Sequence, residues 1–243
     1  SAWLGVLAAG GAGAVLGLIH ALLCQQPRVN DIAVGIALML FGTGLAFFLG
    51  KSFIQPQAPR LPAIALGDWS ASPVVRAALE INVLFIIGAL LAPAMAWFFR
   101  YARWGLRVRI VGESVDAARA LGVNVNRVRL YSTVTGGFLA GVGGSFLSLY
   151  YPGSWNEGLS SGQGLMAVAL VIFARWNPIN CFYASLLFGG AAALGPALQS
   201  VGVTWGYYLF NAAPYVLTLA IMIATSSSQR TLAGMPGVFV QGK

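Results

Sequence analysis

The chain has 243 residues, of which 58% are hydrophobic and only 8% are charged. A soluble domain usually carries about 25% Asp, Glu, Lys and Arg, so this chain has too little polar surface to cover itself in water. The composition indicates an integral membrane protein and excludes a soluble enzyme, a nucleic-acid-binding domain and a disordered tail. The net charge of +8 then reports a basic excess in the loops on one side of a membrane.

Apolar stretches recur along the chain, and a helix needs about 20 mostly apolar residues to cross a bilayer. The candidate spans are Ala2–Cys24, Ile32–Gly50, Ile81–Phe99, Leu130–Tyr150, Leu159–Ala174, Ile179–Val201 and Tyr207–Thr225. The fifth is marginal, because its apolar part is short for a full crossing. We therefore predict an all-α, polytopic transmembrane helix bundle of about seven spans, in which residues 1–243 form one domain in the lipid bilayer.

Basic residues set the orientation of the spans. The segment 100–129 contains seven arginines, so the positive-inside rule makes it cytoplasmic. Alternation then places the C-terminus inside and the N-terminus outside, and we expect at least one earlier helix. The segments 51–80 and 151–163 fall outside. Plain connecting loops and a docking surface for an external partner both fit these two segments, and the residues alone favour plain loops.

Small residues recur every four positions in three of the spans and would let helix backbones approach closely. The stripes are Thr133, Gly137, Gly141 and Ser145 in the fourth span, Ser185, Gly189, Ala193 and Ala197 in the sixth, and the pair Gly13 and Gly17 in the first. We expect Gly137, Gly141 and Gly189 to serve helix packing.

No charged residue lies in the middle of a predicted span, which argues against a proton relay or a charged solute. Neutral polar and aromatic side chains suit an uncharged polar solute, although interhelical hydrogen bonds and core filling explain each of them equally well. The candidate pathway residues are Ser145, Gln199, Asn211, Phe47 and Tyr208. One histidine and two cysteines form no metal-site pattern. Leu49–Ser52 resembles the end of a nucleotide-binding loop but lacks its first glycine.

A short helix is predicted within the segment 100–129. Ser114 is a suitable N-cap, Asp116 falls in the first turn, and Gly122 suits the left-handed position just past the end. A helix of about two turns is not stable alone in water, so it must pack on a neighbour. Small residues such as Ala117 and Ala118 would permit insertion into a partner's groove. A helix lying on the lipid surface is the alternative, and the residues alone favour neither.

Several stretches resemble one family of membrane proteins. They are Val111–Gly144, which begins VGESVDAARALGV, then Gly162–Ala169, Arg175–Pro178 and Gly17–Ala21. The chain is similar through nearly all of its length to bacterial ABC importer permeases of the branched-chain amino acid, ribose and nucleoside type. The nucleoside and simple-sugar permeases are the most similar group.

The resemblance implies a mechanism. Two permease subunits, identical or paralogous, would form the pathway, and a periplasmic or lipid-anchored binding protein would deliver solute to the outer loops. Separate ATPase subunits would hold ATP and Mg, so the chain would bind no cofactor and would be a transport subunit of the bacterial inner membrane, not an enzyme. The ATPase contact carried over from the family comprises Glu113, Ser114, Asp116, Ala117, Ala118, Arg119 and Leu121. The expected solute is a nucleoside, then a ribose-like sugar, then a branched-chain amino acid.

Two other functions agree less well with the sequence. A secondary transporter or channel would be supported by an inverted repeat or a mid-span charge, and the sequence shows neither. An intramembrane hydrolase could use Ser145 and His20, but we expect these residues near opposite membrane faces, beyond hydrogen-bond reach.

Overall fold

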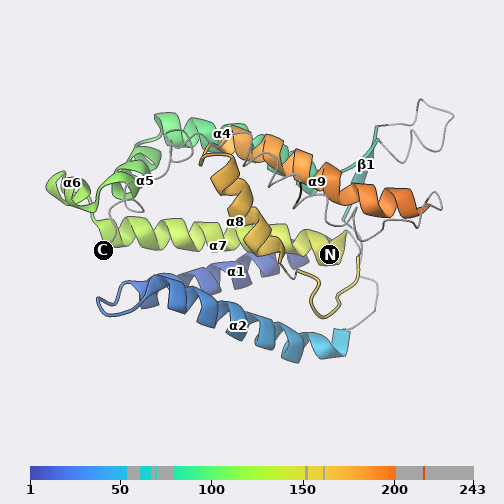
Figure 1. Ribbon diagram of the computed structural model, residues 1–243, viewed down its shortest axis with the longest axis horizontal. Helices are drawn as coiled ribbons and strands as arrows, with labels where there is room; N and C mark the ends of the chain where they lie inside the picture. Colours follow the sequence, from blue (N-terminus) through green and yellow to red (C-terminus); the bar gives the residue numbers. More distant parts are fainter. Residues whose placement is uncertain are drawn as a thin grey trace. The chain divides into compact units, whose positions relative to one another are not determined.

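The computed structural model describes residues 1–53, 61–66, 69, 79–150, 153–160, 162–200 and 216 (Figure 1). The chain divides into two compact units. The first unit comprises Ser1–Gly88 and Arg103–Ser161, and the second comprises Ala89–Ala102 and Gly162–Lys243. The assignment of residues 1–243 to one permease domain stays a prediction.

Two antiparallel helices, α1 (Ala2–Cys24) and α7 (Val125–Leu149), form the centre of the first unit (Figure 1). At one end of the pair, the Nε2 atom of Gln25 donates a hydrogen bond to the carbonyl oxygen of Asn126 at 3.5 Å. At the other end, a Cβ added to Gly5 would lie 3.3 Å from the side chain of Leu149. The two helices therefore stay in contact along their whole length.

Glycines bring α1 and α7 together. A Cβ added to Gly17 would lie 2.8 Å from the carbonyl oxygen of Thr133, and a Cβ on Gly141 would overlap the carbonyl oxygen of Ala9. In lipid there is no hydrophobic driving force for helix association, so close van der Waals contact between the backbones must stabilise the pair. The small-residue stripe of the fourth predicted span thus faces the glycines of the first.

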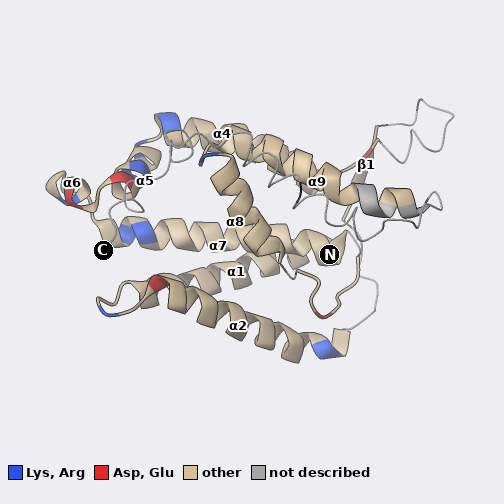
Figure 2. Cartoon of the chain, in the orientation of Figure 1, with Lys and Arg blue, Asp and Glu red and all other residues tan. Residues whose placement is uncertain are grey.

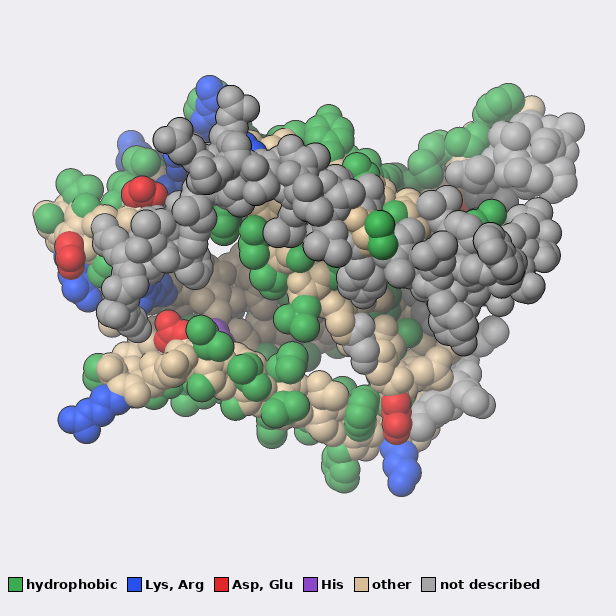
Figure 3. All heavy atoms as spheres, in the orientation of Figure 1, with side chains coloured by type: hydrophobic (Ala, Val, Ile, Leu, Met, Phe, Trp, Pro, Cys, Tyr) green, Lys and Arg blue, Asp and Glu red, His purple; other side chains and the backbone are tan. Residues whose placement is uncertain are grey.

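The helix α2 (Asp31–Gly50) begins at Asn30, whose side chain accepts hydrogen bonds from the backbone nitrogens of Ile32 at 2.9 Å and Ala33 at 3.3 Å. It has no buried residue, and it continues into the 3-10 turn η1 (Lys51–Phe53). Figure 3 shows hydrophobic side chains along α2, with basic side chains beyond its two ends. Such a surface suits contact with lipid or other membrane helices, because both are apolar.

A small sheet lies between α2 and α4 in the chain. Its strands, β1 (Ala63–Ala65) and β2 (Glu80–Asn82), pair antiparallel with Ile64 opposite Ile81. Just before β1, the backbone nitrogen of Leu61 donates to the carbonyl oxygen of Leu149 at 3.1 Å. The sequence predicted a loop for β1 and the start of the third span for Ile81 and Asn82 of β2, because three-residue strands are too short to show an alternating pattern.

The helix α4 (Val83–Tyr101) starts in the first unit and ends in the second, which also holds α8 (Gln163–Phe173) and α9 (Pro178–Ser200). The rings of Phe173 and Phe188 pack α8 on α9, with centroids 6.2 Å apart.

The turn between α8 and α9 is tight. Arg175 and Trp176 both have left-handed backbones, with φ of 53° and 56°, which costs energy for residues with a side chain. Asn177 then starts α9, because its Oδ1 atom accepts from the backbone nitrogens of Ile179 at 3.0 Å and Asn180 at 3.4 Å. Pro178 occupies the first helical position, where its missing N–H is no loss.

The described helices follow most of the predicted spans. Helix α1, α2 with η1, and α4 are each long and apolar enough to cross a membrane. Helix α7 corresponds to the fourth prediction with 25 residues, and α8 has only 11, in agreement with the marginal fifth stretch. Helix α9 covers the sixth prediction up to Ser200. The seventh, Tyr207–Thr225, lies outside the described residues except for Val216.

Candidate functional site

The short helix predicted within residues 100–129 is present and packs against two longer helices. Helix α5 (Arg103–Glu113) leads into α6 (Val115–Ala120), and a four-residue connection leads on to α7. A cluster of buried side chains joins the three helices and consists of Val111, Ala118, Val125 and Val128. Ala118 has no exposed surface at all. Packing on α5 and α7 thus supplies the support that so short a helix needs.

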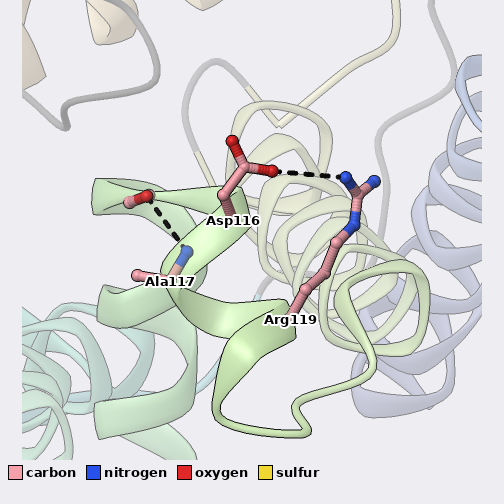
Figure 4. A network of polar contacts seen from close by, with 4 residues as sticks. Asp116, Ala117 and Arg119 are labelled. Atoms are coloured by element: carbon pink, nitrogen blue, oxygen red, sulfur yellow. Dashed lines mark hydrogen bonds and ion pairs between the residues drawn. The ribbon is translucent and has the colours of Figure 1, made fainter.

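The start of α6 is capped by Ser114. Its Oγ atom accepts a hydrogen bond from the backbone nitrogen of Ala117 at 3.2 Å, and its backbone is extended (Figure 4). Asp116 follows in the first turn, where the positive end of the helix dipole favours a carboxylate. Asp116 also pairs with Arg119 at 3.5 Å, but both side chains are exposed, so water screens the pair and it adds little stability.

The end of α6 is a Schellman motif. Gly122 has φ of 73°, its nitrogen donates to the carbonyl oxygen of Arg119 at 2.9 Å, and the nitrogen of Val123 donates to that of Ala118 at 2.9 Å. The side chain of Val123 packs against the buried cluster, as this motif usually arranges. Both ends of α6 are therefore satisfied by the chain itself, and its geometry does not depend on a partner.

The predicted coupling residues, in α6 and just beside it, lie on two faces, one buried and one exposed. Ala118 points into the cluster, so it anchors α6 and does not present itself to a partner. Ser114 is half-buried at the cap. The exposed members are Glu113, Asp116, Ala117, Arg119 and Leu121, and the side chain of Leu121 is 68% exposed. The exposed face of α6 therefore consists of one large apolar side chain among small and charged residues.

Basic residues gather at the end of the first unit that carries α6. Figure 2 shows Lys and Arg residues, coloured blue, on α5 and on the first turns of α7. Arg28, in the loop between α1 and α2, lies at the same end, because that loop follows the Gln25–Asn126 contact. At the opposite end the described residues of the unit hold Lys51, which follows α2. The charge bias of the sequence is thus present in the folded unit.

Of the five predicted pathway residues, the structure describes the side chains of Ser145 and Phe47. Ser145 is 4% exposed and its Oγ atom donates to the carbonyl oxygen of Val142 in its own helix at 2.6 Å, while Phe47 lies on the exposed helix α2. Tyr208, Asn211 and the side chain of Gln199 lie outside the described residues.

Two other predicted features can be placed. Gly189 on α9 has no atom within 4 Å of an added Cβ among the described residues, unlike Gly137 and Gly141. His20 lies near the C-terminal end of α1, and its Nε2 atom is 3.5 Å from the Sγ atom of Cys24. Ser145 lies near the opposite end of the pair formed by α1 and α7. The two groups of the hydrolase alternative are therefore not in contact.

One buried polar side chain was missed by the sequence reasoning. Asn82 is 3% exposed, and its Oδ1 atom accepts from the backbone nitrogen of Leu84 at 2.7 Å. Its Nδ2 atom has no hydrogen-bond partner within the described part of the chain. Its position just before α4 resembles an ordinary helix cap in the sequence, so nothing in the pattern indicated burial.

Comparison with known proteins decides the family. Residues 1–226 match the family described as branched-chain amino acid transport system / permease component. The chain belongs to this permease family. No solved structure matches the permease.

Three curated relatives resemble the permease over most of its length. A Haloferax volcanii protein whose name proposes a glucose ABC transporter permease is 34% identical, covering 83% of this chain and 63% of the relative. The nucleoside ABC transporter permease protein NupC of Lactococcus lactis is 30% identical, covering 90% and 72%. The guanosine ABC transporter permease protein NupQ of Bacillus subtilis is 32% identical, covering 89% and 71%. The chain thus spans about two thirds of these relatives' own length.

These matches confirm several predictions from the sequence. The permease is a multi-pass helical membrane protein, and its relatives are transport components and not enzymes. Membership of the ABC permease family also means that it works with partner subunits.

Proposed function

We propose that the permease is the membrane-spanning subunit of an ATP-driven importer, and that α6 is the point at which a separate ATPase subunit acts on it. The observation that carries this proposal is the construction of α6, which is capped at both ends, anchored by Ala118 and exposed on the face that includes Leu121. A partner that binds this face would move α6 together with the helices packed against it, because close-packed side chains transmit displacement.

The route from α6 into the membrane runs through α7. The buried cluster links Ala118 to Val125 and Val128 at the start of α7. Further along, α7 meets α1 through backbone contacts at Gly137 and Gly141. A push on α6 would therefore shift α7 and α1 together, which is the kind of rigid-element movement that alternating access requires.

The solute we propose is a nucleoside, with a simple sugar second and a branched-chain amino acid third. NupC and NupQ carry nucleoside and guanosine in their names, and the Haloferax relative carries glucose. Charged residues in the described membrane helices stand only near helix ends, such as Asp31 in α2 and Arg100 in α4. A pathway without ionisable groups at depth suits a neutral, polar solute.

The assembly we propose has a second permease subunit, identical or paralogous, two ATPase subunits and an external binding protein, periplasmic or lipid-anchored. ATP and Mg would be held by the ATPase, and the permease itself would hold no cofactor. The basic end of the first unit and the C-terminus would face the cytoplasm of a bacterial cell, in the inner membrane.

Reconstituted uptake tests the proposal. The permease is purified with its ATPase, inserted into vesicles and supplied with the external binding protein and radiolabelled guanosine, glucose or leucine. We expect uptake of guanosine that requires hydrolysable ATP on the α6 side. A non-hydrolysable ATP analogue is the matched control and should give no accumulation. Uptake driven by an ion gradient without ATP would instead establish a secondary transporter.

A further inference from the structure

A groove beside α6 shares only Leu121 with the proposed coupling face. It has a volume of about 750 Å³ and is bounded by α5, the connection from α6 to α7, and the first turns of α7. Its most distinctive side chains are Trp104 and Arg107 from α5, and Arg127 and Tyr131 from α7. All of these residues belong to the first unit.

Two exposed aromatic rings and a guanidinium form one part of the groove. The rings of Trp104 and Tyr131 meet edge to face, with centroids 6.0 Å apart and an angle of 86° between their planes. The Cζ atom of Arg107 lies 5.2 Å from the Trp104 centroid, which is a favourable cation–π distance. This contact holds the guanidinium at the groove, although 47% of Trp104 and 57% of Tyr131 remain exposed.

The groove carries positive charge, and its lining supplies no carboxylate to neutralise it. No Asp or Glu is among its lining residues. In the part of the chain that the structure describes, the only ion pair joins Arg119 to Asp116 on α6, outside the groove. Arg107 and Arg127 therefore offer two unpaired guanidiniums to one space. A guanidinium donates several hydrogen bonds in a plane, a geometry that fits the oxygens of a phosphate.

The level of the groove along the helices indicates where such a phosphate would come from. Asn126, one residue before Arg127, contacts Gln25 at the end of the apolar helix α1. The groove thus opens where two membrane helices end. Trp and Tyr collect at this level of a bilayer, and basic residues there attract anionic lipid headgroups.

We propose that this groove binds the headgroup phosphate of an anionic phospholipid from the leaflet on the α6 side. Arg107 and Arg127 contact the phosphate, and Trp104 and Tyr131 pack against the glycerol and the first acyl carbons. The site rests on the membrane placement of this end of the permease, which the proposed function shares, but it needs no particular solute or ATPase. A lipid held here braces α5 against α7 beneath α6.

Native mass spectrometry of the detergent-purified permease tests the site, with phosphatidylglycerol as the probe. The variant R107Q/R127Q should bind the lipid roughly thirty-fold more weakly than the parent protein, because each arginine near a membrane surface contributes about a factor of five. Arg28→Gln is the matched control, since it removes one charge at the same end outside the groove, and it should retain the lipid. The variant R107K/R127K keeps both charges and should bind within a few-fold of the parent.

Three results would overturn the proposal. The first is equal lipid retention by R107Q/R127Q and the parent, with thermal unfolding showing that both are folded. The second is displacement of the lipid from the parent by inorganic phosphate alone, which would make the site one for free phosphate. The third is a loss of ATPase co-purification by R107Q/R127Q while its lipid retention is unchanged. That result would assign the groove to the ATPase subunit. A failure of ATP-driven uptake leaves the lipid measurement intact, so the two proposals can fail separately.

Discussion

Gly13 of α1 and Gly137 of α7 each occupy the space in which the other would place a side chain, because a Cβ on either would overlap the carbonyl oxygen of its partner. Neighbouring positions repeat the contact, with Gly17 beside Thr133 and Gly141 beside Ala9. The two backbones are therefore in direct contact over several turns, and no larger residue fits in place of these four glycines without moving a helix.

This contact predicts that Gly141→Leu destabilises the permease. The added side chain would force α1 and α7 apart, and overpacking of this kind costs about 1–3 kcal/mol. Thermal unfolding in detergent measures the effect, and assembly of the transporter should weaken with it. Gly143→Leu is the matched control, because no atom lies within 4 Å of a Cβ there. Equal melting temperatures for the two variants would show that the helix contact is not tight.

The exposed and buried faces of α6 predict different outcomes for the same new charge. Leu121→Asp alters an exposed side chain, so the fold should keep its thermal stability while ATPase binding and ATP-dependent uptake fall. Ala118→Asp buries a carboxylate among valines, so it should lower thermal stability as well.

Gln26→Asp is the control for both α6 variants. Gln26 is exposed in the loop after α1, at the same end of the first unit but away from α6. It introduces the same charge without touching the proposed coupling face. Normal ATPase co-purification and uptake by Leu121→Asp would remove α6 from the coupling mechanism.

Local signals in the sequence predicted local structure well. Ser114 and Gly122 cap α6 as expected, because caps depend on a few neighbouring residues. The spacing of small residues indicated which face of α7 is smooth, but not that α1 would cover it, since the choice of partner depends on distant parts of the chain. The inward position of Ala118 was not predicted either, because a six-residue helix is too short to show a clear periodicity.

The groove beside α6 was not predicted either. From the sequence, Arg107 and Arg127 served only to orient the helices. A tryptophan and an arginine three positions apart, Trp104 and Arg107, and the matching Arg127 and Tyr131 on α7, were the available signal. Their joint placement in one groove requires α5 to fold back beside α7, which no local pattern specifies.

The left-handed backbone of Gly122 predicts that Gly122→Ala loosens the end of α6. A residue with a Cβ pays roughly 1–2 kcal/mol at this φ, and the hydrogen bonds from Gly122 and Val123 back into α6 should weaken. Hydrogen exchange over residues 114–123 should accelerate. Gly122→Asn is the matched control, because asparagine tolerates this conformation better, and it should exchange more slowly than the alanine variant. Unchanged protection in Gly122→Ala would show that the Schellman motif does not hold α6.

The last prediction concerns the end of the first unit away from α6. A Cβ added to Gly50 at the end of α2 would lie 2.5 Å from the ring of Trp155, so Gly50→Ala must displace that ring. The hydrogen bond from the backbone nitrogen of Leu61 to the carbonyl oxygen of Leu149 places the start of the sheet at the end of α7, on the side of the unit away from α6. We expect this region to be part of the docking surface for the external binding protein.

On that basis, Gly50→Ala should weaken binding of the external protein roughly tenfold, because interface side chains in well-packed positions contribute more than about 1 kcal/mol each. Surface plasmon resonance on the permease in nanodiscs measures the change, and ATPase co-purification should stay normal. Gly44→Ala on the same helix is the control, since an added Cβ there meets no atom within 4 Å. Equal affinity of the two variants for the external protein would place its docking surface elsewhere, because only Gly50→Ala disturbs Trp155.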